Sequence, residues 1–268
     1  MSSLGADYEL ERQGPVLVWW FGQNFSQSRY GDRTNGKIEG KIVKNRFGFP
    51  NFLPHSLPAP GSNACTLIAL LVALRISQGD IKISGGHDCC TQMPLSSQLI
   101  KCLADSFVQG NEIHERLLKS GELPHVNMSV PEAIQAAGKS MRSIIEWKSL
   151  VYLMDMGSSL FDQLNETVQE WYRNPPPNYS DNLFVIVIAD NRSVLLTFQH
   201  SVQKVTLIDS HQHLNRGAVV AQVDLQKLGS LCAWYLGLMK HCYNVRPSCY
   251  ELSYLYFRRY EGGEMILC

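Results

Sequence analysis

A cysteine near the start of an apolar run is the first residue whose type and position could do chemistry. Cys65 lies where an extended segment meets residues 64–77, a run that predicts a buried helix. The first turn of a helix presents unpaired N–H groups and a partial positive charge, which stabilise a thiolate and can hold a developing oxyanion. Cys65 is therefore a candidate nucleophile. The competing interpretation is a small core residue, because free cysteine is among the most buried residue types.

Asp209 and His211 form the candidate acid and base. A strand expected at residues 205–208 leads into them, and residues two apart on a strand project to the same side. An aspartate beside a histidine orients the ring and stabilises its imidazolium, and histidine suits general base work near neutral pH. Two other histidines remain open as the base: His200, at the end of the preceding expected strand, and His213, two residues beyond His211.

The elements that must position these residues follow from the hydrophobic pattern. Helices are expected at residues 64–77, 95–108, 112–119, 130–137, 160–172 and 225–241, and strands at 16–21, 37–43, 183–189, 194–198, 205–208, 219–223 and 250–260. A helical middle followed by an antiparallel sheet predicts an α+β fold, with a helical half packed against the sheet. Ser62 and Asn63 are expected to cap the helix of Cys65, and Ser129 with Glu132 forms a capping-box pair.

Two regions are expected along the chain. Residues 1–60 read as a β-rich lead-in that packs on the core, and residues 61–268 as the catalytic-type domain, together one compact unit. The 24 basic and 24 acidic residues give zero formal net charge, which argues against a nucleic-acid coat and a polybasic membrane anchor. No apolar run approaches the ~20 residues of a membrane helix, and the N-terminal segment lacks a signal-peptide pattern. Eight cysteines then predict free thiols in a reducing compartment, cytoplasmic or nuclear.

A metal site is the competing use of the cysteines. His87, Asp88, Cys89 and Cys90 are four consecutive residues, but adjacent cysteines fit a zinc site poorly because structural zinc prefers two to four residues between them. We expect no metal and no cofactor. The chain also lacks a phosphate-binding loop of the Walker type and the Gly-x-Ser-x-Gly elbow of serine hydrolases.

The order of nucleophile before base resembles that of papain-like cysteine peptidases. The segment Gly61-Ser-Asn-Ala-Cys65 before an apolar helix, and residues 205–211 followed by Arg216-Gly-Ala, resemble the deubiquitinase domain of herpesvirus large tegument proteins. In that domain the base and its acid lie together at one strand end. The resemblance covers about residues 55–75 and 183–222. The sequence departs from the more common papain-like layout, because no histidine precedes the strand at 183–189.

The resemblance implies a role for each candidate residue. Cys65 would be the nucleophile, His211 the general base and later acid, and Asp209 the residue that orients the ring. The backbone N–H of Cys65 and the side chain of Asn63 would hold the oxyanion; two further amides that remain open for that role are Asn51 and Gln23. The implied reaction is cleavage of a protein tail through a thioester, with ubiquitin or a ubiquitin-like modifier as substrate. The alternative is a catalytically inactive papain-like domain that acts as a protein-binding module, and the oligomeric state is not predicted.

Overall fold

One antiparallel sheet runs through the part of the chain that the computed structural model describes, residues 8–27, 63–83, 94–123, 125–177 and 179–258. Its strand order is β1-β2-β7-β6-β5-β4-β8-β3, and every neighbouring pair is antiparallel. The strands are β1 (Tyr8–Gln13), β2 (Val16–Gly22), β3 (Ile144–Tyr152), β4 (Asn182–Ala189), β5 (Arg192–Gln199), β6 (Lys204–Asp209), β7 (Arg216–Asp224) and β8 (Tyr250–Phe257). The predicted α+β class is confirmed.

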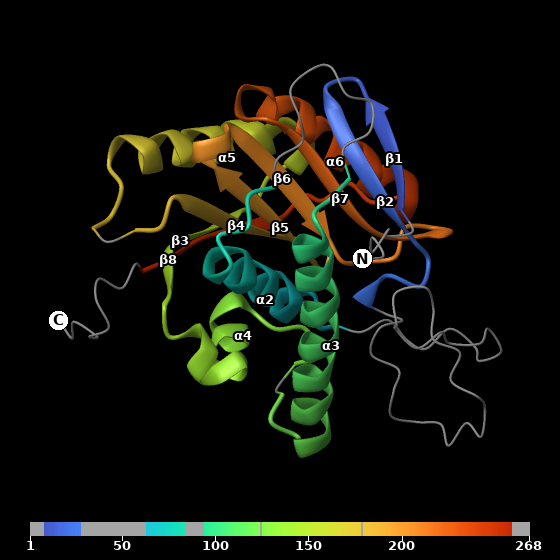
Figure 1. Ribbon diagram of the computed structural model, residues 1–268, viewed down its shortest axis with the longest axis vertical. Coiled ribbons are helices and arrows are strands. Elements are labelled where there is room, and N and C mark those ends of the chain that lie inside the picture. Colours follow the sequence, from blue (N-terminus) through green and yellow to red (C-terminus); the bar gives the residue numbers. More distant parts are fainter. Residues whose placement is uncertain (1–7, 28–62, 84–93, 124, 178, 259–268) are drawn as a thin grey trace.

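Helices cover both faces of this sheet (Figure 1). On one face lie α2 (Cys65–Gln78), α3 (Ser97–Ser120) and α4 (Val130–Ala137), and α2 packs directly on β5 and β4. On the other face α5 (Met156–Arg173) packs with α6 (Leu228–Tyr243), which also contacts β7 and β2. The expectation of a single helical half against the sheet is therefore corrected. The central strands are buried on both faces, so each face needs a covering layer.

The hairpin between β4 and β5 shows how local sequence sets the central register. Asp190 and Asn191 both take positive φ, 50° and 57°, as the two-residue turn that matches strand twist requires. The register then pairs Ile188 with Ser193 and Phe184 with Thr197. This register places Ser193 at the start of β5, beneath the first turn of α2.

Several helix ends differ from expectation, and one agrees. The capping box of Ser129 and Glu132 at α4 is confirmed, with reciprocal bonds of 2.8 and 3.5 Å. The proposed cap of α2 is wrong: the N-cap residue is Ala64, which supplies no side-chain bond, and α2 begins at Cys65. In place of the two helices expected at residues 95–108 and 112–119, the structure has the single helix α3, and Gly110 lies where α3 comes close to α2.

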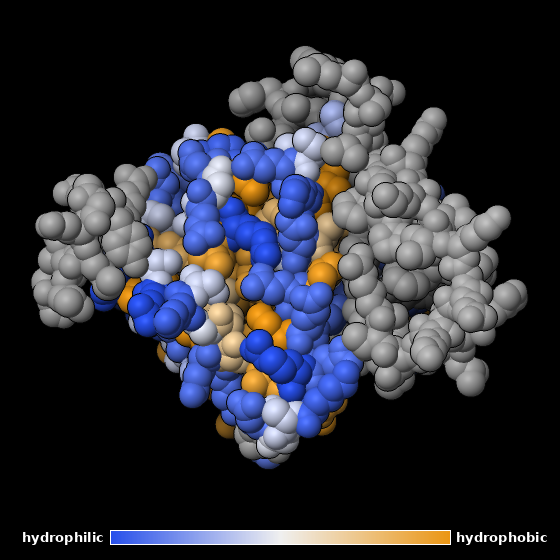
Figure 2. Space-filling model, turned by 60° about the horizontal axis from the view of Figure 1, so that its bottom comes forward, coloured by the Kyte–Doolittle hydropathy of each residue, from blue (hydrophilic) through white to orange (hydrophobic). Residues whose placement is uncertain are grey.

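Two strands, β1 and β3, lie where the sequence patterns predict no element, and they form the two edges of the sheet. The strand expected at residues 37–43 lies outside the described residues, as does most of the lead-in, and the division near residue 60 stays a prediction. On the face that Figure 2 shows, hydrophobic residues lie in small patches among hydrophilic ones. Within the described ranges, no helix has the length and apolar character needed to span a membrane.

Candidate active site

Cys65 is the first residue of α2, at the point where the chain enters the helical layer. Its side chain is 5 % exposed, yet it does not belong to the cluster of apolar side chains that surrounds the rest of α2. The N–H groups of the first helical turn have no acceptor within the helix, so they are directed toward the same region as the thiol. The helix therefore offers both the sulfur and the donors that an acyl-transfer site needs.

Asp209 ends β6, and His211 lies in the loop that follows. Nδ1 of His211 is 2.6 Å from Oδ1 of Asp209, and the same oxygen accepts the backbone N–H of His211 at 2.9 Å. The carboxylate is 1 % exposed, and the His211 side chain is 12 % exposed. Because Nδ1 is held by the carboxylate, the other ring nitrogen of His211 is the one left to meet a nucleophile.

The thiol of Cys65 lies close enough to His211 for each group to shift the pKa of the other, so the structure brings the three residues together. Burial alone would raise the pKa of Cys65, but the hydrogen bond and charge of His211 lower it overall. Burial would lower the pKa of His211, but Asp209 and then Cys65 raise it to about 10. The lowered pKa of Cys65 and the raised pKa of His211 both favour a thiolate beside an imidazolium.

Two other buried cysteines show what burial does without such a partner. Burial raises the pKa of Cys102 and of Cys232 to about 12. These thiols belong to the apolar clusters of the two helical layers. The contrast separates Cys65 from a simple core cysteine, because its burial is similar and the direction of its pKa is opposite.

Ser193 is a neighbour of Cys65 that the sequence did not reveal. Its hydroxyl and its backbone N–H both lower the pKa of the Cys65 thiol, and its Oγ lies 2.9 Å from Oγ1 of Thr66. Thr66 donates its own proton to the carbonyl of Met128 at 3.0 Å. The Ser193 proton is therefore left to point at either Thr66 or the sulfur, and a thiolate would attract it. No local sequence signal marks this contact, because it joins β5 to α2 across more than 120 residues.

A second set of contacts holds the turn between Asp209 and His211. Ser210 lies between them, donates its hydroxyl to Oε1 of Gln27 at 2.7 Å and accepts the Gln27 N–H on its carbonyl at 2.8 Å. Asn111 of α3 in turn donates to the Gln27 carbonyl at 2.8 Å. The segment that follows β2 thus clamps the backbone of the acid–base pair.

The two rival bases lie elsewhere. His200 is exposed, at the end of β5 that pairs with the start of β6, whereas Asp209 is at the far end of β6. His200 therefore cannot pair with Asp209. His213 does contact Asp209, but through the second carboxylate oxygen, with Nε2 3.1 Å from Oδ2.

The oxyanion candidates are placed only in part. Asn63 is half-buried, two residues before Cys65, and Gln23 is half-buried just after β2. Asn51 lies outside the described residues, and so does the cluster of His87, Asp88, Cys89 and Cys90. Among the residues with described positions, no group of three or more His, Cys, Asp or Glu side chains is arranged to hold a metal ion. The five cysteines in the described ranges are free thiols.

No family model matches the chain, and no curated protein sequence matches it. Among solved structures, it is similar to the ubiquitin-specific protease encoded by tegument protein M48 of murine cytomegalovirus, which was crystallised with a ubiquitin-based suicide substrate. That match has 12 % identity and a TM-score of 0.41, and it covers 76 % of this chain and 82 % of that one.

A second solved structure is the avirulence protein AvrPphB of Pseudomonas. It is 11 % identical, with a TM-score of 0.41, and the match covers 72 % of this chain and 91 % of that one. Similarities of this size do not assign a function, so the function is derived from the side chains of the site.

Proposed function

We propose that this protein is a cysteine-type hydrolase in which Cys65 is the nucleophile, His211 the general base and acid, and Asp209 the residue that orients His211. The single observation that carries the proposal is the thiol of Cys65 beside a histidine whose Nδ1 is held by a buried carboxylate. This arrangement activates a nucleophile and is not needed to fill a core.

The reaction proceeds in two steps. The Cys65 thiolate attacks the carbonyl carbon of the scissile bond, and the proton on His211 passes to the leaving amine as the carbon–nitrogen bond breaks. The product is a thioester on Cys65. His211, now neutral, takes a proton from water as the water oxygen attacks the thioester, and the carboxylic product leaves while Cys65 returns to thiolate. The N–H of Cys65 stabilises the oxyanion in both steps, and Asn63 is the side chain proposed to assist it.

The substrate proposed is the tail of a protein, ubiquitin or a ubiquitin-like modifier. The support is the sequence resemblance around Cys65 and around residues 205–218. The papain-like fold and a cytoplasmic or nuclear location belong to the same proposal.

The test uses ubiquitin, and in parallel ubiquitin-like modifiers, with an electrophile in place of the C-terminal carboxylate. We expect one covalent adduct, mapped to Cys65 by mass spectrometry and absent in Cys65→Ala. Cys232→Ala removes a buried thiol on the opposite face of the sheet and should label like the unmodified protein. An adduct that persists in Cys65→Ala would move the nucleophile elsewhere and refute the assignment.

A binding module without turnover is the second candidate function. The observation that favours it is the 5 % exposure of Cys65, which leaves little room for a reagent to approach along the described residues. Under this hypothesis a small alkylating reagent would react slowly with Cys65 at every pH, and the modifiers would bind without an adduct. Rapid alkylation of Cys65 near neutral pH would exclude it.

A further inference from the structure

Asp209 is shared between two histidines, and the mechanism above uses only one of them. Oδ1 faces His211, while Oδ2 faces Nε2 of His213 at 3.1 Å. The other nitrogen of His213, Nδ1, is 2.9 Å from the carbonyl oxygen of Gly217. The backbone of His213 is fixed as well, because it exchanges two hydrogen bonds with Arg216, of 3.0 and 2.8 Å.

These contacts define the protonation state of His213. A carboxylate oxygen and a carbonyl oxygen can only accept hydrogen bonds, and a neutral imidazole has a single N–H to give. Both contacts are therefore satisfied only when both ring nitrogens of His213 carry protons. The His213 side chain is 1 % exposed, so an unpaired nitrogen there would be costly.

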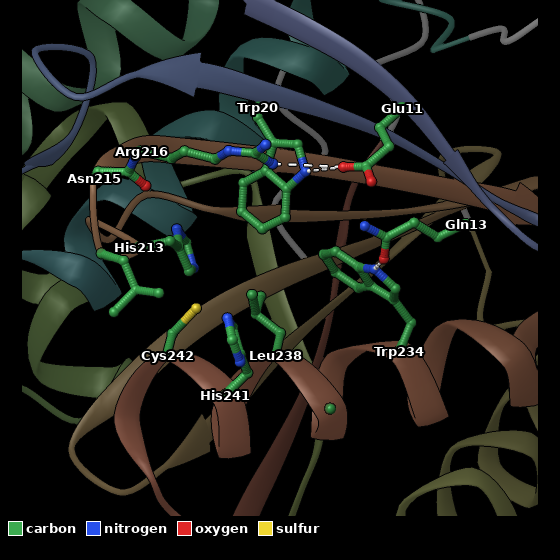
Figure 3. A pocket seen from close by; sticks show the side chains of 12 residues that line it. Glu11, Gln13, Trp20, His213, Asn215, Arg216, Trp234, Leu238, His241 and Cys242 are labelled. Carbon is green, nitrogen blue, oxygen red and sulfur yellow. Dashed lines mark hydrogen bonds and ion pairs between the residues drawn. The ribbon is translucent and has the colours of Figure 1, made fainter.

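The other groups around His213 do not supply a competing anion in contact with it. Its ring packs edge-on to Trp20 and lines a cavity of about 520 Å³ on the α6 side of the sheet (Figure 3). Besides Asp209, the titratable or charged groups that face it are Arg216 from β7, Glu11 from β1, and His241, Cys242 and Tyr243 from α6. Burial raises the pKa of Cys242 and of Tyr243, which keeps both neutral.

Glu11 is an anion, but its charge is committed elsewhere. Hydrogen bonds from Gln13, Trp20 and Arg216 outweigh burial and lower the pKa of Glu11. Its Oε2 accepts Nε1 of Trp20 at 3.1 Å and lies 3.5 Å from Arg216, as Figure 3 shows. Asp209 is therefore the anion in contact with His213 among the described residues.

We propose that His213 is a positioning residue, held as an imidazolium, that takes up part of the charge of Asp209 so that His211 can release its proton after the thioester forms. The proposal rests on the proposed function and adds a role for a residue outside the three catalytic groups. His213 acts on the site through Oδ2 of Asp209.

The physical reason lies in the second step of the reaction. His211 must be neutral to take a proton from water, and the charge of Asp209 favours its imidazolium form. A second cation, His213 on Oδ2, offsets part of the charge of Asp209 and repels a proton on His211, so it lowers the pKa of His211. Removing the charge of His213 should thus strengthen the His211 imidazolium and slow hydrolysis of the thioester, while formation of the thioester is unaffected.

The experiment compares His213→Gln with the unmodified protein, using p-nitrophenyl acetate as a generic acyl donor. Glutamine can still donate to Asp209, but it carries no charge. Mass spectrometry follows acetyl-Cys65 as it forms and decays across pH. We expect unchanged formation and a decay curve displaced upward by about 1 pH unit, which makes decay near neutral pH about tenfold slower. His241→Gln is the matched control: the same residue type lines the same cavity, but Asp209 pairs with His211 and His213 instead.

The outcomes separate this proposal from the proposed function. Decay curves that overlay for His213→Gln and the unmodified protein overturn the role of His213 and leave the hydrolase assignment intact. Failure of Cys65 to acetylate in the unmodified protein overturns both. A second measurement needs no variant: nitrogen NMR of the unmodified protein should show both ring nitrogens of His213 protonated at neutral pH. A neutral His213 ring would refute the proposal even if His213→Gln failed to fold.

Discussion

Replacing Asp209 by asparagine tests the charge at the centre of the site without changing its shape. The carboxylate receives three hydrogen bonds, two on Oδ1 from His211 and one on Oδ2 from His213. An asparagine can keep all three contacts if its oxygen faces His211 and its amide N–H donates to Nε2 of His213. His213 then becomes neutral and still donates from Nδ1 to the Gly217 carbonyl. Asp209→Asn therefore removes charges and retains the hydrogen-bond network.

The size of the effect of Asp209→Asn follows from the groups that raise the pKa of His211. Burial opposes the imidazolium, and the charge and hydrogen bond of Asp209 are the first causes that raise the pKa of His211 to about 10. An opposite charge at this distance is worth about 1–3 pH units, and each unit is tenfold in population. Without that charge, the pKa of His211 falls from about 10 by about that amount, so the imidazolium that lowers the pKa of Cys65 is held less firmly. We expect the pKa of Cys65 to rise by up to the same amount, about 1–3 pH units.

The assay is alkylation by iodoacetamide across pH, with each cysteine quantified on its own peptide. The reactivity of Cys65 should rise at a clearly higher pH in Asp209→Asn than in the unmodified protein. Cys249 is exposed and serves as the internal reference for the reagent. Superimposable Cys65 curves for the two proteins would refute the ion-pair reasoning, because they would show that Asp209 does not control the protonation of the thiol.

The stability of the same pair should depend on pH in a defined direction. The pKa of His211 is raised in the folded protein, to about 10. The imidazolium of His211 therefore contributes fully to the free energy of unfolding below the ordinary histidine pKa near 6.5, and this contribution is lost as the pH rises toward about 10. The difference in free energy of unfolding between the unmodified protein and Asp209→Asn should therefore shrink over that interval. Urea titrations at pH 6, 8 and 10 measure it, and a difference that grows with pH would contradict the assignment.

Three other contacts give further predictions. Gly217→Ala should destabilise the fold by about 3 kcal/mol, because a Cβ there would overlap the carbonyl oxygens of Gly22, at the end of β2, and of Phe25, just after it. Gly237→Ala in α6, where a Cβ meets open space, is the control and should be neutral or stabilising in the same thermal melts. Gly110→Ala places a Cβ 2.5 Å from a buried side chain of α2 and should cost about 1–2 kcal/mol, so an unchanged melting temperature would refute the close approach of α3 to α2. Ser193→Ala removes a donor to the sulfur and should raise the pKa of Cys65, seen as slower alkylation at pH 6; equal rates would show that the hydroxyl does not serve the thiolate.

The candidate triad could be predicted because each part carries a local signal. The apolar run after Cys65 marks a helix start, and the spacing of Asp209 and His211 at a strand end places both side chains together. His211 meets the carboxylate because it follows the end of β6 that carries Asp209. His200 does not, because it lies beside the other end of β6. The antiparallel pairing of β5 with β6 decides it, and this pairing is a property of the whole sheet.

The residues that support the triad could not be predicted in this way. Ser210 bonds Gln27 from 183 residues away, and Ser193 reaches Cys65 across the interface between β5 and α2. Neither contact leaves a period or a motif in the sequence. The gap left between the helices expected at 95–108 and 112–119 contains Gly110, which in the structure lies within α3 and provides room for α2.

Asp209 lies where the two helical layers meet through the sheet. On the side of α2, Asp209 contacts His211, which lies beside Cys65. On the side of α6, Asp209 contacts His213, whose ring contacts Trp20 and Tyr243. A buried carboxylate stays ionised only where its partners offset the effect of burial, and His211 and His213 together lower the pKa of Asp209 against burial. The charge of Asp209 is thereby shared between partners on two faces of the sheet. The second helical layer, which the sequence did not place, thus bears directly on the chemistry of the first.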